Sequence, residues 1–265
     1  GWRSTAFSFG SNRPPMLSRL RARLRRLSRR GKIALALIGL AALAGCGALA
    51  VFLFSQTQSN SGGAIRRWFS DPDSRDDLTT SLHAPCPGAP FLLPTEGLIG
   101  LLWRDPSGPY HIFRRHTGLD IFGDGPPGTV PVVAAYDGYL TRLDSWVSSV
   151  IIRHDDPLQP GNTIWTYYTH MASRDGETSY INQAFPPGAS EVWVEQGALL
   201  GYQGNYSGSA IPVGTHLHFS IVQSEPDGSF KNEAKLDNTL DPSPYLGMPL
   251  NISERPERPI TCQSS

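Results

Sequence analysis

The sequence predicts a mostly β domain, an antiparallel sheet built from hairpins, preceded by one transmembrane helix. The helix is predicted by an uncharged apolar run over residues 33–54. The sheet is predicted because short β-branched and aromatic runs, separated by Gly, Pro, Asn and Asp, begin at about Pro85. No segment after residue 60 shows a long amphipathic helix. With 39% hydrophobic residues, the chain has enough apolar side chains for a core, which excludes a disordered protein.

The apolar run is IALALIGLAALAGCGALAVFLF, and as a helix it would be roughly 30 Å long, the thickness of a hydrocarbon core. Residues 1–32 carry ten of the 23 Lys and Arg residues and no acid. Positive charge favours the cytoplasmic side of a membrane. We therefore expect a basic cytoplasmic segment over 1–32, a transmembrane helix over 33–54 and a single-pass protein of the cell membrane whose remainder is extracytoplasmic.

Two alternatives concern this N-terminal region. The basic segment could bind nucleic acid, but the apolar run directly after it favours membrane topology and contact with anionic lipids, so no nucleic-acid partner is expected. Residues 43–46, Leu-Ala-Gly-Cys, resemble the site at which bacterial lipoproteins are cut and lipidated, here at Cys46. Because the run stays apolar up to Phe54, we favour an uncut span over lipoprotein anchoring.

The remainder divides into three parts. Residues 55–84 are polar and charged and are interpreted as a linker or stalk, residues 85–250 form the β-rich domain, and residues 251–265 are a C-terminal tail. Cys86 and Cys262 bracket the domain. They either pair in an oxidising compartment or remain free thiols, because sequence does not show how close their Cα atoms come.

Histidines stand in three arrangements that suit a metal hydrolase. His116 and Asp120 flank a glycine turn, and imidazole and carboxylate are suitable zinc ligands. His216 and His218 alternate on one predicted strand, whose period of two sends both rings to one face. His170 ends the run TIWTYYTHM, on the face of Tyr168 if the alternation holds. The remaining histidines, which have no second ligand at metal spacing, are interpreted as surface or packing residues: His83, His111 and His154.

The order of HTGLDI, PVVAAYDGYL, VIIRHDDP, WTYYTHM and GTHLHFSI resembles the lysostaphin-like (LytM-type) zinc metallopeptidase family, which consists of peptidoglycan endopeptidases. The resemblance covers about residues 95–222. It implies that residues 85–250 are a zinc metallopeptidase domain with its metal site in a groove. It further implies Zn²⁺ ligands at His116, Asp120 and His218 and catalytic histidines at His170 and His216. Two segments, 155–161 and 173–188, look longer than usual, and Ser220 stands where an acid is frequent.

The resemblance implies a zinc-dependent endopeptidase that hydrolyses peptide bonds of bacterial peptidoglycan through a metal-activated water. His170 and His216 would then orient and deprotonate the water and stabilise the oxyanion or protonate the leaving amine, and their division of roles stays open. Tyr110 and Tyr168 are candidate substrate contacts, with packing as the alternative for each. Other functions to weigh are a non-catalytic activator or scaffold for other cell-wall hydrolases and a zinc-carrying binding protein. Protein partners and the oligomeric state stay open.

Overall fold

The computed structural model describes residues 28–209 and 212–263 and divides the chain into two compact units, residues 1–51 and 52–265. Helix α2 (Arg29–Thr57) contains the expected apolar run. Within the described residues it is the one helix long and apolar enough to cross a membrane, over Arg29–Phe54. Of the basic segment expected over 1–32, residues 1–27 lie outside the described residues.

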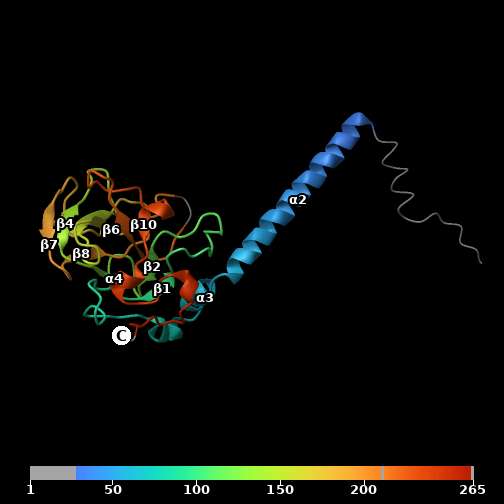
Figure 1. The fold of residues 1–265 in the computed structure, drawn as a ribbon. Coiled ribbons are helices and arrows are strands. Elements are labelled where there is room, and N and C mark those ends of the chain that lie inside the picture. The colour runs from blue at the N-terminus through green and yellow to red at the C-terminus, as the bar shows by residue number, and fades with distance from the viewer. Residues whose placement is uncertain (1–27, 210–211, 264–265) are drawn as a thin grey trace, which may run out of the picture. The chain divides into compact units, whose positions relative to one another are not determined.

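The second unit is built on an antiparallel sheet, which confirms the predicted fold class (Figure 1). Its strands pair in the order β1-β2-β9-β6-β5-β4-β7, and β10 also pairs with β9. The strands of this sheet are β1 (Leu98–Leu101), β2 (Leu119–Phe122), β4 (Gly138–Thr141), β5 (Val150–Asp155), β6 (Thr163–Thr169), β7 (Val192–Val194), β9 (Leu217–Gln223) and β10 (Thr239–Leu240). A smaller sheet joins β3 (Pro131–Val133) to β8 (Leu199–Tyr202). Short helical segments are η3 (Leu236–Asn238), α4 (Ser243–Leu246) and η4 (Ile252–Glu254).

The two faces of the large sheet differ in chemistry. On β9, Leu217 and Phe219 belong to the main hydrophobic core, whereas His218 lies on the opposite face, as the period of two requires. The register pairs His218 directly with Asp120 on β2 and with Thr169 on β6. Because directly paired residues share a face, the sheet itself brings a carboxylate and an imidazole from distant parts of the sequence together.

Residues 61–78, within the expected linker, are folded onto the sheet. They form α3 (Ser61–Ser70), η1 (Pro72–Ser74) and η2 (Asp76–Leu78). Trp68 of α3 is 2% exposed and packs in a small cluster with Leu98 and Phe122. The apolar side of this helix packs on β1 and β2, so the helix is part of the folded domain. We therefore propose that only the start of residues 55–84 acts as a linker.

Cys86 and Cys262 form a disulfide, which confirms the first of the two alternatives, with Cα atoms 5.5 Å apart. The C-terminal tail also packs on the sheet, because the Arg258 guanidinium donates to the backbone oxygens of Ile99 and Gly100. Burial lowers the pKa of Arg258 to about 10. The tail is thus fixed by a covalent bond to Cys86 and by polar contacts to β1.

Candidate metal centre

Three buried side chains, His116, Asp120 and His218, converge on one point. His116 Nε2 lies 3.1 Å from Asp120 Oδ1 and 3.0 Å from His218 Nδ1, and the latter two atoms are 2.9 Å apart. Zinc binds nitrogen and oxygen ligands at roughly 2.0–2.2 Å in a tetrahedron, which places neighbouring ligand atoms roughly 3.3 Å apart. The separations found here are close to that spacing, so these donor atoms fit a zinc ion.

The outer nitrogens of both histidines have partners that orient the rings. His116 Nδ1 lies 3.0 Å from the backbone oxygen of Leu102, which only accepts, so this nitrogen carries a proton. His218 Nε2 lies 2.9 Å from Ser220 Oγ. Such outer contacts fix the ring orientation of metal-binding histidines. They leave His116 Nε2 and His218 Nδ1 directed at Asp120.

The electrostatics of the three groups favour a positive charge between them. Burial raises the pKa of Asp120, but the charge of His116 and hydrogen bonds from both histidines outweigh it and hold the pKa well below its usual value. Burial lowers the pKa of His116, and Asp120 more than offsets this, so the pKa is raised. A proton on His116 therefore competes with a metal ion for the same place, and metal binding would release that proton.

His170 and His216 lie beside the three candidate ligands. Their ring centroids are 4.3 Å apart, and His216 Nε2 is 4.0 Å from Asp120 Oδ1. His170 Nδ1 donates to the backbone oxygen of Tyr206, and His216 Nδ1 donates to that of Gly214 at 2.7 Å. Because Nδ1 carries the proton in each ring, Nε2 is left as a proton acceptor in the neutral form. Burial, followed by the charges of His216 and His218, lowers the pKa of His170 to about 3.

The orientation expected for His170 is wrong. Alternation along the strand would place it on the face of Tyr168, but β6 ends at Thr169 and His170 has a φ of 77°. This left-handed conformation is uncommon outside glycine. It turns the chain so that the His170 ring lies 6.2 Å from that of His218.

The two tyrosine predictions have different outcomes. The Tyr110 ring lies 4.9 Å from that of His116, beside a cavity of about 180 Å³ that borders the metal centre. Tyr168 is fully buried, and its hydroxyl accepts a hydrogen bond from the Ala135 amide at 2.9 Å. Its prediction as a substrate contact is therefore wrong, because strand alternation directs it into the core.

Tyr167, the neighbour of Tyr168, also lies at the cavity and was not predicted from the sequence. Its register partner on β9 is Ser220, so both lie on the face of His218. The ring of Tyr167 is 6.2 Å from that of His218, and its hydroxyl is 3.3 Å from Ser149 Oγ. Alternation counted back from Thr169, the last residue of the strand, would have placed Tyr167 on this face. The other residues lining the cavity are Arg114, Arg115, Thr117, Thr169, His170, His218, Glu233 and Ala234.

Histidines interpreted as surface or packing residues lie away from the centre. His154 is buried with Nδ1 2.7 Å from the Asp137 backbone oxygen and Nε2 2.7 Å from Thr166 Oγ1. Burial lowers its pKa to about 4. Its two nitrogens are satisfied within the fold, so it is a structural residue. His83 is exposed, and His111 Nδ1 accepts from the Phe113 amide.

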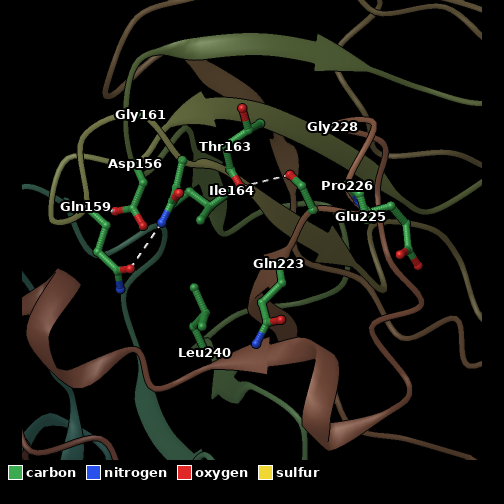
Figure 2. Close-up of a pocket in the computed structure, with 12 residues that line it drawn as sticks. Asp156, Gln159, Gly161, Thr163, Ile164, Gln223, Glu225, Pro226, Gly228 and Leu240 are labelled. Carbon is green, nitrogen blue, oxygen red and sulfur yellow. Dashed lines mark hydrogen bonds between the residues drawn. The ribbon is translucent and has the colours of Figure 1, made fainter.

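A larger hollow, about 610 Å³, lies where β6 begins and β9 ends, away from the metal centre. Figure 2 shows Asp156 and Gln159 on one side of it and Glu225 on the other. The Asp156 carboxylate accepts hydrogen bonds from the Tyr245 hydroxyl and from the amides of Leu158 and Gln159. Asp156 therefore stabilises the loop after β5. The candidate metal centre borders the smaller cavity, so the smaller cavity is the candidate site.

Several solved structures of peptidases are similar to this chain, whereas no protein-family model and no curated protein matches the sequence. Lysostaphin from Staphylococcus simulans aligns at 23% identity over 50% of this chain and 43% of its own, with a TM-score of 0.32. The chain is similar to lysostaphin-like peptidases.

Two further matches to solved peptidase structures have comparable values. The catalytic domain of the prophage-encoded M23 protein EnpA from Enterococcus faecalis aligns at 25% identity over 46% of this chain and 78% of its own, with a TM-score of 0.29. A zinc containing peptidase from Vibrio cholerae aligns at 17% identity over 56% of this chain and 36% of its own, also with a TM-score of 0.29. All three TM-scores are below 0.5, and the site assignment therefore rests on the geometry of His116, Asp120 and His218.

Proposed function

We propose that this chain is a zinc-dependent endopeptidase that hydrolyses peptide bonds of bacterial peptidoglycan. The observation that carries the proposal is the convergence of His116 Nε2, Asp120 Oδ1 and His218 Nδ1 within 3.1 Å of one another. Two imidazoles and one carboxylate are a donor set typical of catalytic zinc, which keeps a fourth position open. The cavity lined by His170 and His218 offers a place for a substrate beside these ligands.

A zinc ion held by these side chains would polarise the scissile carbonyl and lower the pKa of water to about 7. His170 and His216 each present Nε2 as an acceptor. One of them takes the proton of the attacking water as the new bond to the carbonyl carbon forms. A protonated imidazole then donates to the leaving nitrogen as the peptide bond breaks. Proton transfer near neutral pH suits imidazole, whose ordinary pKa is about 6.5, and the lowered pKa of His170 favours the proton-accepting role for that residue.

The surroundings of His170 bear on its role. It is buried beside His216, and burial together with the charges of His216 and His218 disfavours a proton on His170. Two imidazoles that are not assigned as metal ligands support catalysis over a purely metal-carrying site, which would have no use for them.

The peptidoglycan substrate is supported by the motif order that resembles the lysostaphin-like family and by α2. We propose that α2 anchors the chain in the cell membrane with the catalytic unit outside the cytoplasm. A periplasmic-type reporter fused after Ser265 should be active, whereas a cytoplasmic reporter fused there should not. Activity of the cytoplasmic reporter alone would exclude the proposed topology.

The proposed reaction is tested by digesting purified peptidoglycan of known structure with the full chain in detergent micelles. Mass spectrometry of the fragments should show new amino and carboxyl termini at one type of peptide bond, and a chelator should abolish their formation. Intact peptidoglycan after digestion with zinc-loaded protein would favour the alternative, a non-catalytic activator of other hydrolases.

A further inference from the structure

A second groove opens on the same face of the large sheet as the metal centre. The register pairs Trp193 on β7 with Tyr139 on β4, and Tyr139 with Arg153 on β5. Arg153 pairs in turn with Trp165 and Trp165 with Val222 on β9, and Val222 stands four residues from His218. Because direct partners and every second residue share a face, this row lies on the face of His218.

The groove lies close enough to the metal centre for one polymeric ligand to reach both. Trp193 is four strands away from β9, and strands lie roughly 4.8 Å apart. The groove and the metal centre are therefore separated by a distance on the order of 20 Å. One polymer molecule can therefore be cut beside His218 while another of its segments is bound at Trp193.

The groove has a volume of about 590 Å³ and combines aromatic rings with charged groups. Trp193 is 52% exposed and Tyr139 is 40% exposed, at the β7 edge of the sheet. Large apolar side chains gathered on an exposed surface are typical of binding sites. The groove is also lined by Tyr136, Asp137, Arg153 and Asp155.

Contacts within the groove hold the rings in place and leave Trp193 available. The Arg153 guanidinium lies 4.8 Å from the centre of the Tyr139 ring and pairs with Glu191. Tyr139 meets Trp193 edge to face, with ring centroids 5.1 Å apart. Arg153 therefore covers the Tyr139 ring, whereas half of Trp193 faces water. A fixed aromatic surface loses little conformational entropy on binding.

The charges around Trp193 favour a neutral ligand rich in hydroxyl and amide groups. Asp137 and Asp155 supply carboxylate acceptors, and the positive charge of Arg153 is balanced by Glu191. An anionic ligand would meet net negative charge here. A sugar ring has a flat C–H face that stacks on an aromatic ring and a rim of hydroxyl groups that carboxylates bind.

We propose that this groove binds the glycan strand, a chain of neutral N-acetylated sugars, while the attached peptide lies at the metal centre. This inference rests on the proposed function, because it assumes a substrate in which peptide and glycan are linked. Trp193 is the stacking platform, and Asp137, Arg153 and Asp155 bind the polar rim. The groove thus selects peptides that are attached to cell wall over free peptides.

The inference is tested with a peptide-free probe, N,N′,N″-triacetylchitotriose, titrated into the full chain in detergent micelles by isothermal titration calorimetry. We expect saturable binding, weakened roughly tenfold by Trp193→Ala and less by Trp193→Phe. Val192→Ala is the matched control, because Val192 lies on the same strand and pairs with Leu140 of the core. It should leave the affinity unchanged.

No saturable binding, or equal affinity of the wild type and Trp193→Ala, would overturn the inference. A Trp193-dependent change in oligomeric state without sugar binding would also overturn it and assign the groove to protein contacts. His116→Ala should bind the sugar as the wild type does, since Trp193 is remote from the metal. Sugar binding by a chain that cannot hydrolyse peptidoglycan would refute the proposed function alone, and hydrolysis without sugar binding would refute this inference alone.

Discussion

The ring of Phe122 stacks on that of His216, with centroids 5.1 Å apart and 24° between the ring planes. Phe122 ends β2, two residues after Asp120, and is itself contacted edge to face by Phe69 of α3. The stacked ring and the hydrogen bond to Gly214 together fix the His216 imidazole. Phe122 is therefore a positioning residue for His216.

Phe122→Leu should lower kcat for peptidoglycan hydrolysis roughly 2- to 10-fold, the loss expected for one aromatic pair, with KM and zinc content little changed. The control is Phe91→Leu, which alters a fully buried phenylalanine of the main core. If Phe91→Leu lowers kcat as much as Phe122→Leu does, the effect is general destabilisation and Phe122 has no positioning role.

Ser220 contacts the outer nitrogen of His218, at the position where the resemblance leads one to expect an acid. Loss of such a partner typically weakens metal binding by about 10- to 100-fold. Ser220→Ala should therefore bind zinc at least about tenfold more weakly, as measured by competition with a chromogenic chelator. Ser220→Asp should retain zinc binding, because a carboxylate also accepts from Nε2. Ser224→Ala, which removes a hydroxyl bonded to the Thr163 backbone, is the control. Unchanged affinity in Ser220→Ala would contradict this role.

His154 gives the fold a pH dependence of its own. Its pKa in the fold is about 4, against about 6.5 in an unfolded chain. Above pH 6.5 it is neutral in both states, and as the pH falls toward 4 only the unfolded chain gains the proton. The folded state should lose about 2 kcal/mol between pH 7 and pH 5 from this residue.

The measurement is the urea midpoint of the full chain in detergent, with chelator present at both pH values so that metal release does not contribute. His154→Gln cannot titrate, so its midpoint should fall less between the two pH values than that of the wild type. Parallel losses in the two proteins would show that His154 is not the group responsible.

The sequence predicted those features that depend on local pattern. The H-x-H spacing put His216 and His218 on one side of a strand, and the motif order brought Asp120 to the same place. It could not show that His170 leaves the strand, because that depends on the left-handed φ after Thr169. The prediction of Tyr168 as a substrate contact failed because alternation along β6 directs its side chain into the core.

Other features depended on contacts between distant residues. Packing of α3 on β1 arises from contact between Trp68 and Leu98, which belong to separate segments of the sequence. The role of Ser220 follows from the orientation of the His218 ring. Sequence gave both cysteine alternatives for Cys86 and Cys262, and only the fold brings the pair within bonding distance.

The three candidate metal ligands and the two candidate catalytic histidines should fail differently when substituted. Alanine at His116, Asp120 or His218 removes one ligand, so bound zinc and hydrolysis should fall together. Alanine at His170 or His216 should leave zinc in place while hydrolysis drops roughly 10²- to 10⁴-fold.

The most direct test is zinc content by elemental analysis of the five purified full-length variants, each assayed beside the wild type on sacculi. We expect the variants of His116, Asp120 and His218 to be zinc-free and inactive, and those of His170 and His216 to be zinc-loaded and nearly inactive. Loss of zinc in His216→Ala with retention in His218→Ala would reverse the assignment within that pair. Full activity in all five variants would contradict the proposal that the chain is a zinc-dependent enzyme.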